Sequence, residues 1–287
     1  MRKIFFVVLL LFSAIGCFES KENYVLNPDG SGKVTIVGSF ETAIPGMADV
    51  ADTKEGMRQV KELLEKSKGV DAWSGVSYDR TKEGRVSFQG TAYFPDISKL
   101  DLETFGKDAD LTKEGNNIVL LIEENEETEA LPGKKLSADE VKTQVEKAKK
   151  QWQTMKSMMG PMLRKIKQDL TYRLPGTVES STNMVKIDAN TVNIQVDGAK
   201  LMAAMDAMMT DDAWLKKQAE AGAFGTGDSG PPMDQQELNQ RLFGEKGPVK
   251  AVITGPAQPQ FDYKSEVAAA KAEYTKLIEK LAKETQD

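Results

Sequence analysis

Alternating hydrophobic and polar positions predict a sheet that begins near residue 24. Tyr24-Val-Leu-Asn and Lys33-Val-Thr-Ile-Val are typical of strands, and the intervening Pro28-Asp-Gly-Ser-Gly favours a tight turn. The two segments therefore predict a β-hairpin. The same pattern predicts further strands at about residues 70–80, 85–94, 117–123, 168–174, 184–188, 191–196 and 248–253.

Hydrophobic residues spaced three or four apart predict amphipathic helices between these strands. The clearest helix covers residues 137–168, where Ser137 and Glu140 have the spacing of a capping box. Pro161 lies inside this segment, so we expect a kink near Gly160. Further helices are expected at about residues 48–68, 198–209 and 212–224, in a short segment after residue 232, and from Ser265 onward.

Irregular alternation of strands and helices, with frequent hairpins, favours the α+β class. We expect a mostly antiparallel sheet covered by amphipathic helices, with a helical C-terminal part. Residues 24–200 should form the α+β domain, including the long helix at 137–168. Residues 201–287 should form a mainly helical extension, interrupted by a Gly/Pro-rich linker at 225–232.

The N-terminus has the pattern of a secretion signal. Arg2 and Lys3 give a positive start, and Ile4 to Ile15 form an apolar run interrupted only by Ser13. As a helix at ~1.5 Å per residue the run would be about 18 Å long, which is shorter than the ~30 Å hydrocarbon core of a bilayer. We therefore predict that residues 1–16 are a removed signal peptide and that residues 17–23 are a tether.

The end of this segment, Ala14-Ile-Gly-Cys17, resembles the lipobox of bacterial lipoproteins. The resemblance implies cleavage between Gly16 and Cys17 and attachment to the membrane through diacylglyceryl and N-acyl groups, such as palmitate, on Cys17. Two or more acyl chains suffice for stable anchoring. Phe18 stands where an aspartate would favour inner-membrane retention, so an exported protein on the periplasmic side of the outer membrane or at the cell surface is favoured. The alternative is an ordinary signal followed by a free cysteine.

Charge argues against a nucleic-acid partner. The chain has 38 basic and 44 acidic residues and a net charge of −6. Loss of Arg2 and Lys3 with the signal leaves 36 basic residues and a net charge of −8. A global nucleic-acid role is not expected for such an acidic, exported protein.

The chain contains no histidine, which excludes Ser-His-Asp and Cys-His catalysis and histidine zinc sites. It contains neither Ser-x-x-Lys nor Gly-x-Ser-x-Gly. No cofactor or metal site is expected, and the protein is predicted not to be an enzyme. A carboxylate-only hydrolase stays open as an alternative, because a glycosidase needs only two acids.

Methionines gather in two segments of helical spacing, around residues 155–162 and 202–209. Flexible thioether side chains fill irregular cores, adapt to apolar ligands and bind Cu(I), so all three interpretations apply. An apolar-ligand face would comprise Trp152, Met155, Met159, Met162, Met202, Met205 and Met209.

The long helix is also basic, with eight basic residues and one acid over residues 141–168. Such a helix, with Trp152 among its lysines, is typical of helices that lie on membrane surfaces. The alternative is a helix that covers the sheet and leaves its lysines in solvent.

Three turn-rich motifs resemble exported lipoproteins of the LppM type. They are Leu26-Asn-Pro-Asp-Gly-Ser-Gly-Lys-Val-Thr, Phe88-Gln-Gly-Thr-Ala-Tyr-Phe-Pro-Asp and Leu174-Pro-Gly-Thr-Val-Glu-Ser-Ser. The resemblance implies an α+β body on a lipid anchor and brings no catalytic residues with it. Together these patterns predict a lipid-anchored cell-envelope protein that serves as a non-enzymatic binding or structural module, whose partner is an envelope protein or an apolar ligand. The alternatives are a carrier of an apolar ligand or lipid in a Met-lined groove, and the carboxylate-only hydrolase.

Overall fold

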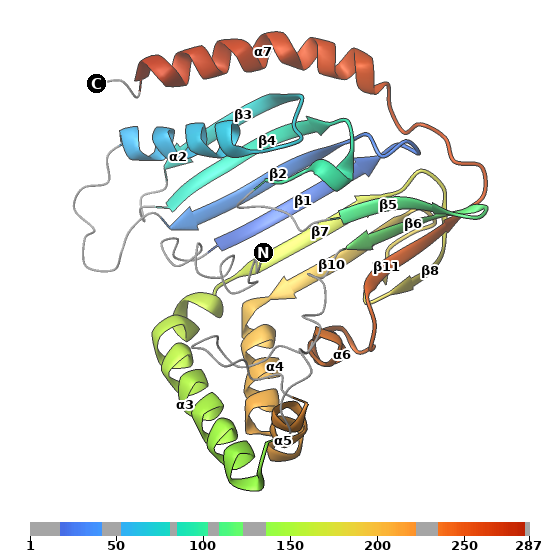
Figure 1. Cartoon of the computed structure of the whole chain (residues 1–287). Coiled ribbons are helices and arrows are strands. Elements are labelled where there is room, and N and C mark those ends of the chain that lie inside the picture. The colour runs from blue at the N-terminus through green and yellow to red at the C-terminus, as the bar shows by residue number, and fades with distance from the viewer. Residues whose placement is uncertain are drawn as a thin grey trace. The chain divides into compact units, whose positions relative to one another are not determined.

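The computed structural model describes residues 18–41, 53–80, 85–102, 109–122, 136–221 and 235–284. They form two compact units (Figure 1). The sheet unit comprises the described parts of Ala14–Glu123, Lys167–Gln195 and Pro248–Asp287. The helical unit comprises those of Glu124–Ile166 and Val196–Gly247.

A seven-stranded sheet forms the larger part of the sheet unit. Its strand order is β3-β4-β2-β1-β7-β10-β9. β1 pairs antiparallel with β2 on one side and parallel with β7 on the other, so it is a central strand. The strands are β1 (Phe18–Leu26), β2 (Gly32–Glu41), β3 (Ala72–Arg80), β4 (Arg85–Phe94), β7 (Lys167–Arg173), β9 (Val185–Lys186) and β10 (Thr191–Asp197).

The predicted hairpin of β1 and β2 is confirmed. Asn27 N donates to Ser31 O at 2.8 Å, and Gly30 adopts a positive φ of 84° that glycine tolerates without strain. Along β2, Val34 and Ile36 are fully buried while Val37 is 46% exposed. This alternation gives the sheet an inner face and an outer face.

A second sheet has the order β5-β6-β11-β8, and its strands pair antiparallel. The strands are β5 (Ala109–Glu114), β6 (Asn117–Ile122), β8 (Thr177–Thr182) and β11 (Val249–Thr254). Two mostly antiparallel sheets with helices confirm the α+β class.

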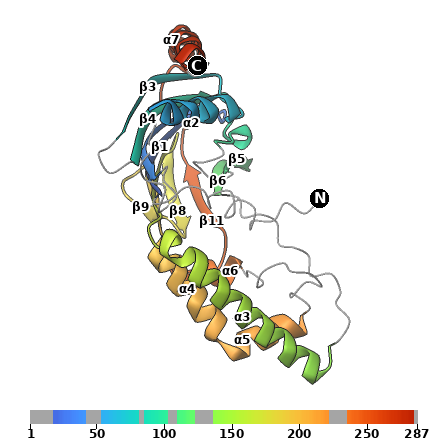
Figure 2. The same cartoon turned by 90° about the vertical axis from the view of Figure 1, so that its left-hand side faces the viewer.

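Two helices and a short 3₁₀ turn, η2 (Ile97–Lys99), complete the sheet unit. α2 (Thr53–Lys66) buries Val60, Leu63 and Leu64. α7 (Tyr263–Glu284) lies along the β3 edge of the large sheet, beside α2 (Figure 2). Because α7 covers this edge, β3 is not open to pair with a strand of another chain.

The helical unit consists of α3 (Ala138–Leu163), α4 (Gly198–Thr210), α5 (Asp212–Glu220) and α6 (Gln235–Phe243). α3 begins with the predicted capping box: Glu140 N donates to Ser137 Oγ, and Ser137 N donates to Glu140 Oε2. At α4 and α5 the N-cap carboxylate alone accepts hydrogen bonds: Asp197 accepts from two backbone amides of α4, and Asp211 accepts from the backbone amide of Trp214 in α5. The part of the chain that the structure describes has no helix long and apolar enough to cross a membrane.

The chain divides at other places than the sequence pattern predicts. The expected domain at 24–200 and the expected extension at 201–287 each contribute to both units. α3 does not cover a sheet, because its apolar face packs against α4 and α5. It ends at Leu163 rather than near residue 168, since β7 begins at Lys167.

The predicted tether also differs from the structure. Residues 18–23 belong to β1, which begins at Phe18 rather than at Tyr24. Glu19, Lys21 and Asn23 are exposed on the outer face, while Ser20 and Glu22 are buried on the inner face. A strand with polar residues on both faces carries no hydrophobic alternation, so its pattern is that of a linker.

Candidate functional site

A buried polar cluster lies on the inner face of β1. Glu22 is fully buried, and both of its carboxylate oxygens accept hydrogen bonds from its own strand. Ser20 Oγ donates to Oε1 at 3.1 Å and Tyr24 Oη donates to Oε2 at 2.7 Å. Because residues two apart share a face of a strand, β1 brings these three side chains together without any help from the loops.

Tyr172 on β7 extends the cluster. It lies directly opposite Tyr24 in the parallel β1–β7 register, and the two rings stack with centroids 4.5 Å apart and 13° between their planes. The Tyr172 hydroxyl is buried and has no hydrogen-bond partner among the described residues. A buried hydroxyl of this kind marks a place where a ligand, a water molecule or strain needs to be considered.

Burial sets the electrostatics of both phenols. Burial, followed by the charge of Glu22, raises the pKa of Tyr24 well above its usual value of about 10. The same two causes, burial first, raise the pKa of Tyr172. Both phenols therefore keep their protons at neutral pH, and each is a hydrogen-bond donor toward Glu22 or toward a bound group.

The surroundings of the cluster are apolar. Glu22 lies opposite Ile36 on β2 and Leu170 on β7, and both are fully buried. The adjacent acid on β7, Asp169, lies opposite Lys21 and so belongs to the outer face. A carboxylate in such a layer is costly unless hydrogen bonds compensate it, as those from Ser20 and Tyr24 do here.

Sequence reasoning missed this cluster because it assigned residues 17–23 to a tether. One signal was available, however. The strand pattern that follows the Asn27–Ser31 turn continues from Gly32 to Phe40. Because the two strands of a hairpin pair residue by residue, the partner strand must extend back from Leu26 to residue 18. Hairpin symmetry would have identified β1 and its inward-facing Ser20 and Glu22.

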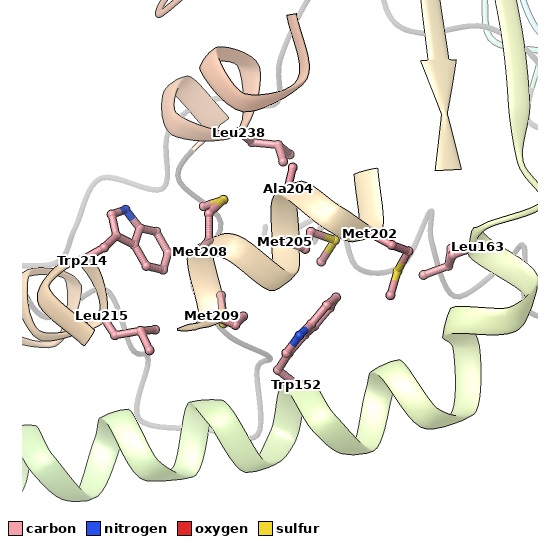
Figure 3. Close-up of a cluster of buried hydrophobic side chains, with 10 residues drawn as sticks. All are labelled: Trp152, Leu163, Met202, Ala204, Met205, Met208, Met209, Trp214, Leu215 and Leu238. Carbon is pink, nitrogen blue, oxygen red and sulfur yellow. The ribbon is translucent and has the colours of Figure 1, made fainter. Parts of the chain in front are cut away.

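The methionines predicted as an apolar-ligand face lie within the helical unit. Met202, Met205 and Met209 on α4 are each at most 3% exposed and surround Trp152 of α3, which is 1% exposed (Figure 3). The core cluster of this unit comprises Trp152, Leu163, Met202, Ala204, Met205, Met208, Met209, Trp214, Leu215 and Leu238.

The remaining methionines of α3 are less buried. Met155 and Met159 are half-buried and pack against this core, and Met162 is half-buried. Met158 points elsewhere and is 71% exposed. The structure therefore brings most of the predicted face together as the packed core of four helices.

A polar contact fixes the orientation of Trp152. Its Nε1 donates to Asp206 Oδ1 at 2.8 Å, and Lys156 Nζ donates to Asp206 Oδ2 at 2.8 Å. One carboxylate thus joins the indole and the ammonium group across α3 and α4. This arrangement satisfies the only polar atom of a buried tryptophan, as core packing requires.

Cys17 and Gly16, the predicted lipidation and cleavage residues, lie outside the described residues. Among the residues that are described, no group of three or more Asp, Glu, Cys or His side chains lies together as metal ligands would.

Comparison with known proteins gives a single line of likeness. No protein-family model and no curated protein matches the sequence. Among solved structures, the chain is similar to the folded domain of LppM from Mycobacterium tuberculosis, at 10% sequence identity and a TM-score of 0.33. The match covers 89% of this chain and 97% of the LppM chain.

Proposed function

We propose that this is an exported protein, anchored by lipid at Cys17, that serves as a non-enzymatic binding module close to the membrane surface. The observation that carries the proposal is the start of β1 at Phe18, immediately after the lipobox cysteine. The anchor then continues directly into a central strand of the folded sheet rather than into a flexible tail.

The geometry keeps the sheet close to the membrane. Glu19 pairs with β2 and β7 and lies two residues after Cys17, which is at most about 7 Å of extended chain. The end of the sheet at which β1 begins would therefore lie at the level of the lipid headgroups. Phe18 after the cysteine favours attachment to the outer membrane.

The outer face of the large sheet is the surface offered to a partner. Lys21 and Asn23 on β1 and Gln89 on β4 are exposed, and the side chains of Thr35 and Thr91 are joined by a 3.0 Å hydrogen bond between them. These residues form a largely polar strip across three adjacent strands, with the exposed Val37 lying between Lys21 and Gln89. A broad polar surface next to an anchor is suited to contact with another envelope protein.

Metabolic labelling tests the anchor. Cells expressing the wild-type chain should incorporate labelled palmitate and retain the protein in the membrane fraction after a high-salt wash. The Cys17→Ser variant should lose the label, and Phe18→Asp should keep the label but move to the inner-membrane fraction of a Gram-negative host. Label that persists in Cys17→Ser would overturn the anchor.

Site-specific photo-crosslinking in cells tests the binding surface. A photoreactive residue at Asn23 or Gln89 should give adducts of a discrete mass, whereas the same residue at Lys276, exposed on α7, should not. Mass spectrometry of the adducts identifies the partner. Equal adducts from all three positions would indicate random collision and would remove the outer face as the binding surface.

The second candidate is a carrier of an apolar ligand, bound at the inner face of β1 instead of in the Met-lined groove that the sequence predicts, because those methionines pack as a core. The orphan Tyr172 hydroxyl beside Glu22 favours it, because a bound polar group could complete that hydrogen bonding inside an apolar layer. The expected result is a co-purifying small molecule, detected by native mass spectrometry, that is lost from Tyr172→Phe. A wild-type protein that contains no small molecule would contradict the carrier.

A further inference from the structure

We propose that the solvent-facing side of α3 binds the surface of an anionic lipid bilayer. Every base on this side is exposed to solvent, and Glu146 is the one exposed acid in the described stretch 141–165. We call this surface the α3 outer face. Its basic residues are Lys142, Lys147, Lys150, Arg164 and Lys165.

Two further bases of α3 lie outside this face. Lys149 forms an ion pair with Asp212, and Lys156 forms one with Asp206 at 2.8 Å. Both lysines therefore hold α3 against its neighbours in the helical unit. Trp152, which the sequence pattern offered as a membrane residue, is buried in the core and does not belong to the outer face.

One end of the outer face also carries apolar groups. Met158 is 71% exposed, and Pro161, one turn later, is exposed as well. Arg164 and Lys165 follow them directly at the end of the helix. Apolar side chains flanked by bases are the composition of helices that bind in the headgroup region of a bilayer.

The short chain segment from α3 to β7, which pairs with β1, limits the distance between this end of α3 and the anchor. This step rests on the proposed function, since it requires lipid on Cys17. Leu163 ends α3, and Lys167, four residues later, lies opposite Glu19 in the β1–β7 register. Chain lengths and strand spacing then limit the separation of Leu163 from Cys17 to roughly 26 Å, however the two units are arranged.

Charge complementarity favours an anionic bilayer over a neutral one. The mature chain has a net charge of −8, so its overall charge repels an anionic membrane. Only a local basic surface can reverse this repulsion at distances within the screening length of about 8 Å. The α3 outer face provides such a surface within reach of the anchor.

Vesicle binding by the mature chain with Cys17→Ser tests the proposal without any contribution from the anchor. The probes are vesicles of 30% phosphatidylglycerol in phosphatidylcholine and vesicles of phosphatidylcholine alone. We expect binding to the anionic vesicles only, weakening as salt is raised. Equal binding to both compositions, or binding to neither, overturns the proposal.

Charge reversal locates the surface. Lys142→Glu, Lys150→Glu and Arg164→Glu together should lower the partition coefficient at least 100-fold, because each base near an anionic surface contributes about 1 kcal/mol, or about fivefold. The matched control reverses three exposed lysines of α7 and produces the same net charge; they are Lys264, Lys271 and Lys276. The control should keep binding within about threefold of wild type, and an equal loss in both variants overturns the assignment to α3.

A fluorescent label reports the contact itself. The Cys17→Ser chain has no other cysteine, so Met158→Cys can carry a single environment-sensitive dye. Its emission should shift to the blue with anionic vesicles, whereas a dye at Val185→Cys, 63% exposed on β9, should not shift. Palmitate labelling of the native chain is measured separately, so failure of the anchor and failure of the α3 outer face give different results.

Discussion

The buried cluster of β1 contains two stacked tyrosines that differ in their hydrogen bonding, so substitutions of the two can be compared. Tyr24 donates to Glu22 at 2.7 Å, whereas the Tyr172 hydroxyl has no partner among the described residues. The rings stack on one another on the inner face of adjacent strands. Replacing each tyrosine by phenylalanine removes one oxygen atom from similar surroundings, so ring volume and stacking are controlled within the pair.

The expected effects have different magnitudes and signs. A hydrogen bond to a charged group contributes about 1.5–3 kcal/mol, so Tyr24→Phe should lower the free energy of unfolding of the sheet unit by about 2 kcal/mol. A buried hydroxyl without a partner costs about 1–3 kcal/mol. Tyr172→Phe should therefore leave the free energy of unfolding unchanged or raise it by about 1 kcal/mol.

Hydrogen exchange read by mass spectrometry resolves the two units. Trp fluorescence would mix Trp73 of the sheet unit with Trp152 and Trp214 of the helical unit. The slowest amides of peptides within residues 18–41 report opening of β1 and β2, while peptides from α4 serve as an internal control. The exchange of α4 should be the same in both variants.

Two results would refute the reasoning. If Tyr172→Phe destabilises the sheet unit as much as Tyr24→Phe, the Tyr172 hydroxyl makes a hydrogen bond to a ligand or a buried water molecule. If neither variant changes exchange, the contact with Glu22 contributes nothing to stability. A double-mutant cycle of Tyr24→Phe with Glu22→Gln then measures the coupling energy directly.

The same two tyrosines should make the sheet unit sensitive to alkali, because above about pH 10 the unfolded state loses phenol protons that the folded state keeps. The free energy of unfolding should then fall by about 1.4 kcal/mol per pH unit for each of the two tyrosines. Denaturation between pH 8 and 11.5 should find a slope smaller by this contribution in the double phenylalanine variant, whose remaining slope comes from Tyr78, Tyr263 and Tyr274, and an unchanged slope would contradict the burial of the two phenols. Met205→Ala should lower the free energy of unfolding of the helical unit by about 2–4 kcal/mol, because it opens a cavity in the core. Met158→Ala at the surface should change the same free energy by less than about 0.5 kcal/mol. Hydrogen exchange in α4 measures both effects. Equal effects of these two substitutions would count against the packed core. Gly198→Ala should destabilise the same unit, because a Cβ there would lie 1.7 Å from the carbonyl oxygen of Leu163, the last residue of α3. Gly160→Ala, whose Cβ would have its nearest contact at 3.4 Å, should stabilise α3 by up to about 1 kcal/mol. Thermal unfolding followed by circular dichroism at 222 nm should show the lower midpoint for Gly198→Ala, and the reverse order would contradict this geometry.

Elements with local signals could be predicted from the sequence. The Asn27–Ser31 turn forms from Pro, Asp and Gly at adjacent positions, and the capping box of α3 needs only Ser137 and Glu140. Each of these features is decided within about five residues. Hairpins and helix starts were therefore recognised near their correct places.

Elements that depend on distant partners could not be predicted. β5 and β8 have too few buried positions to stand out, and they exist as strands because β6 and β11 pair with them. β11 joins the sheet unit from beyond the helical unit, so the chain's division into units reflects pairing across more than a hundred residues. Hydrophobic periodicity contains no information about such partners.

The candidate site fell between these two cases. Its residues are local, since Ser20, Glu22 and Tyr24 alternate along one strand, but their burial depends on β7 and β2. A sequence pattern assigns a run of polar residues to solvent, because most polar residues are exposed. Only the long-range pairing of β1 shows that half of this run faces inward.

The register of β1 against β7 depends on the buried cluster. The tight turn fixes β1 against β2, but no turn joins β1 to β7, because 140 residues separate the end of β1 at Leu26 from the start of β7 at Lys167. A slip of β7 by one residue would turn Leu170 and Tyr172 to the outer face, and a slip of two would separate the stacked Tyr24 and Tyr172. The buried cluster thus favours one register, and in that register Glu19 lies opposite the first residue of β7. The polar residues that cost stability inside the sheet therefore determine which residue of β1 lies beside the start of β7.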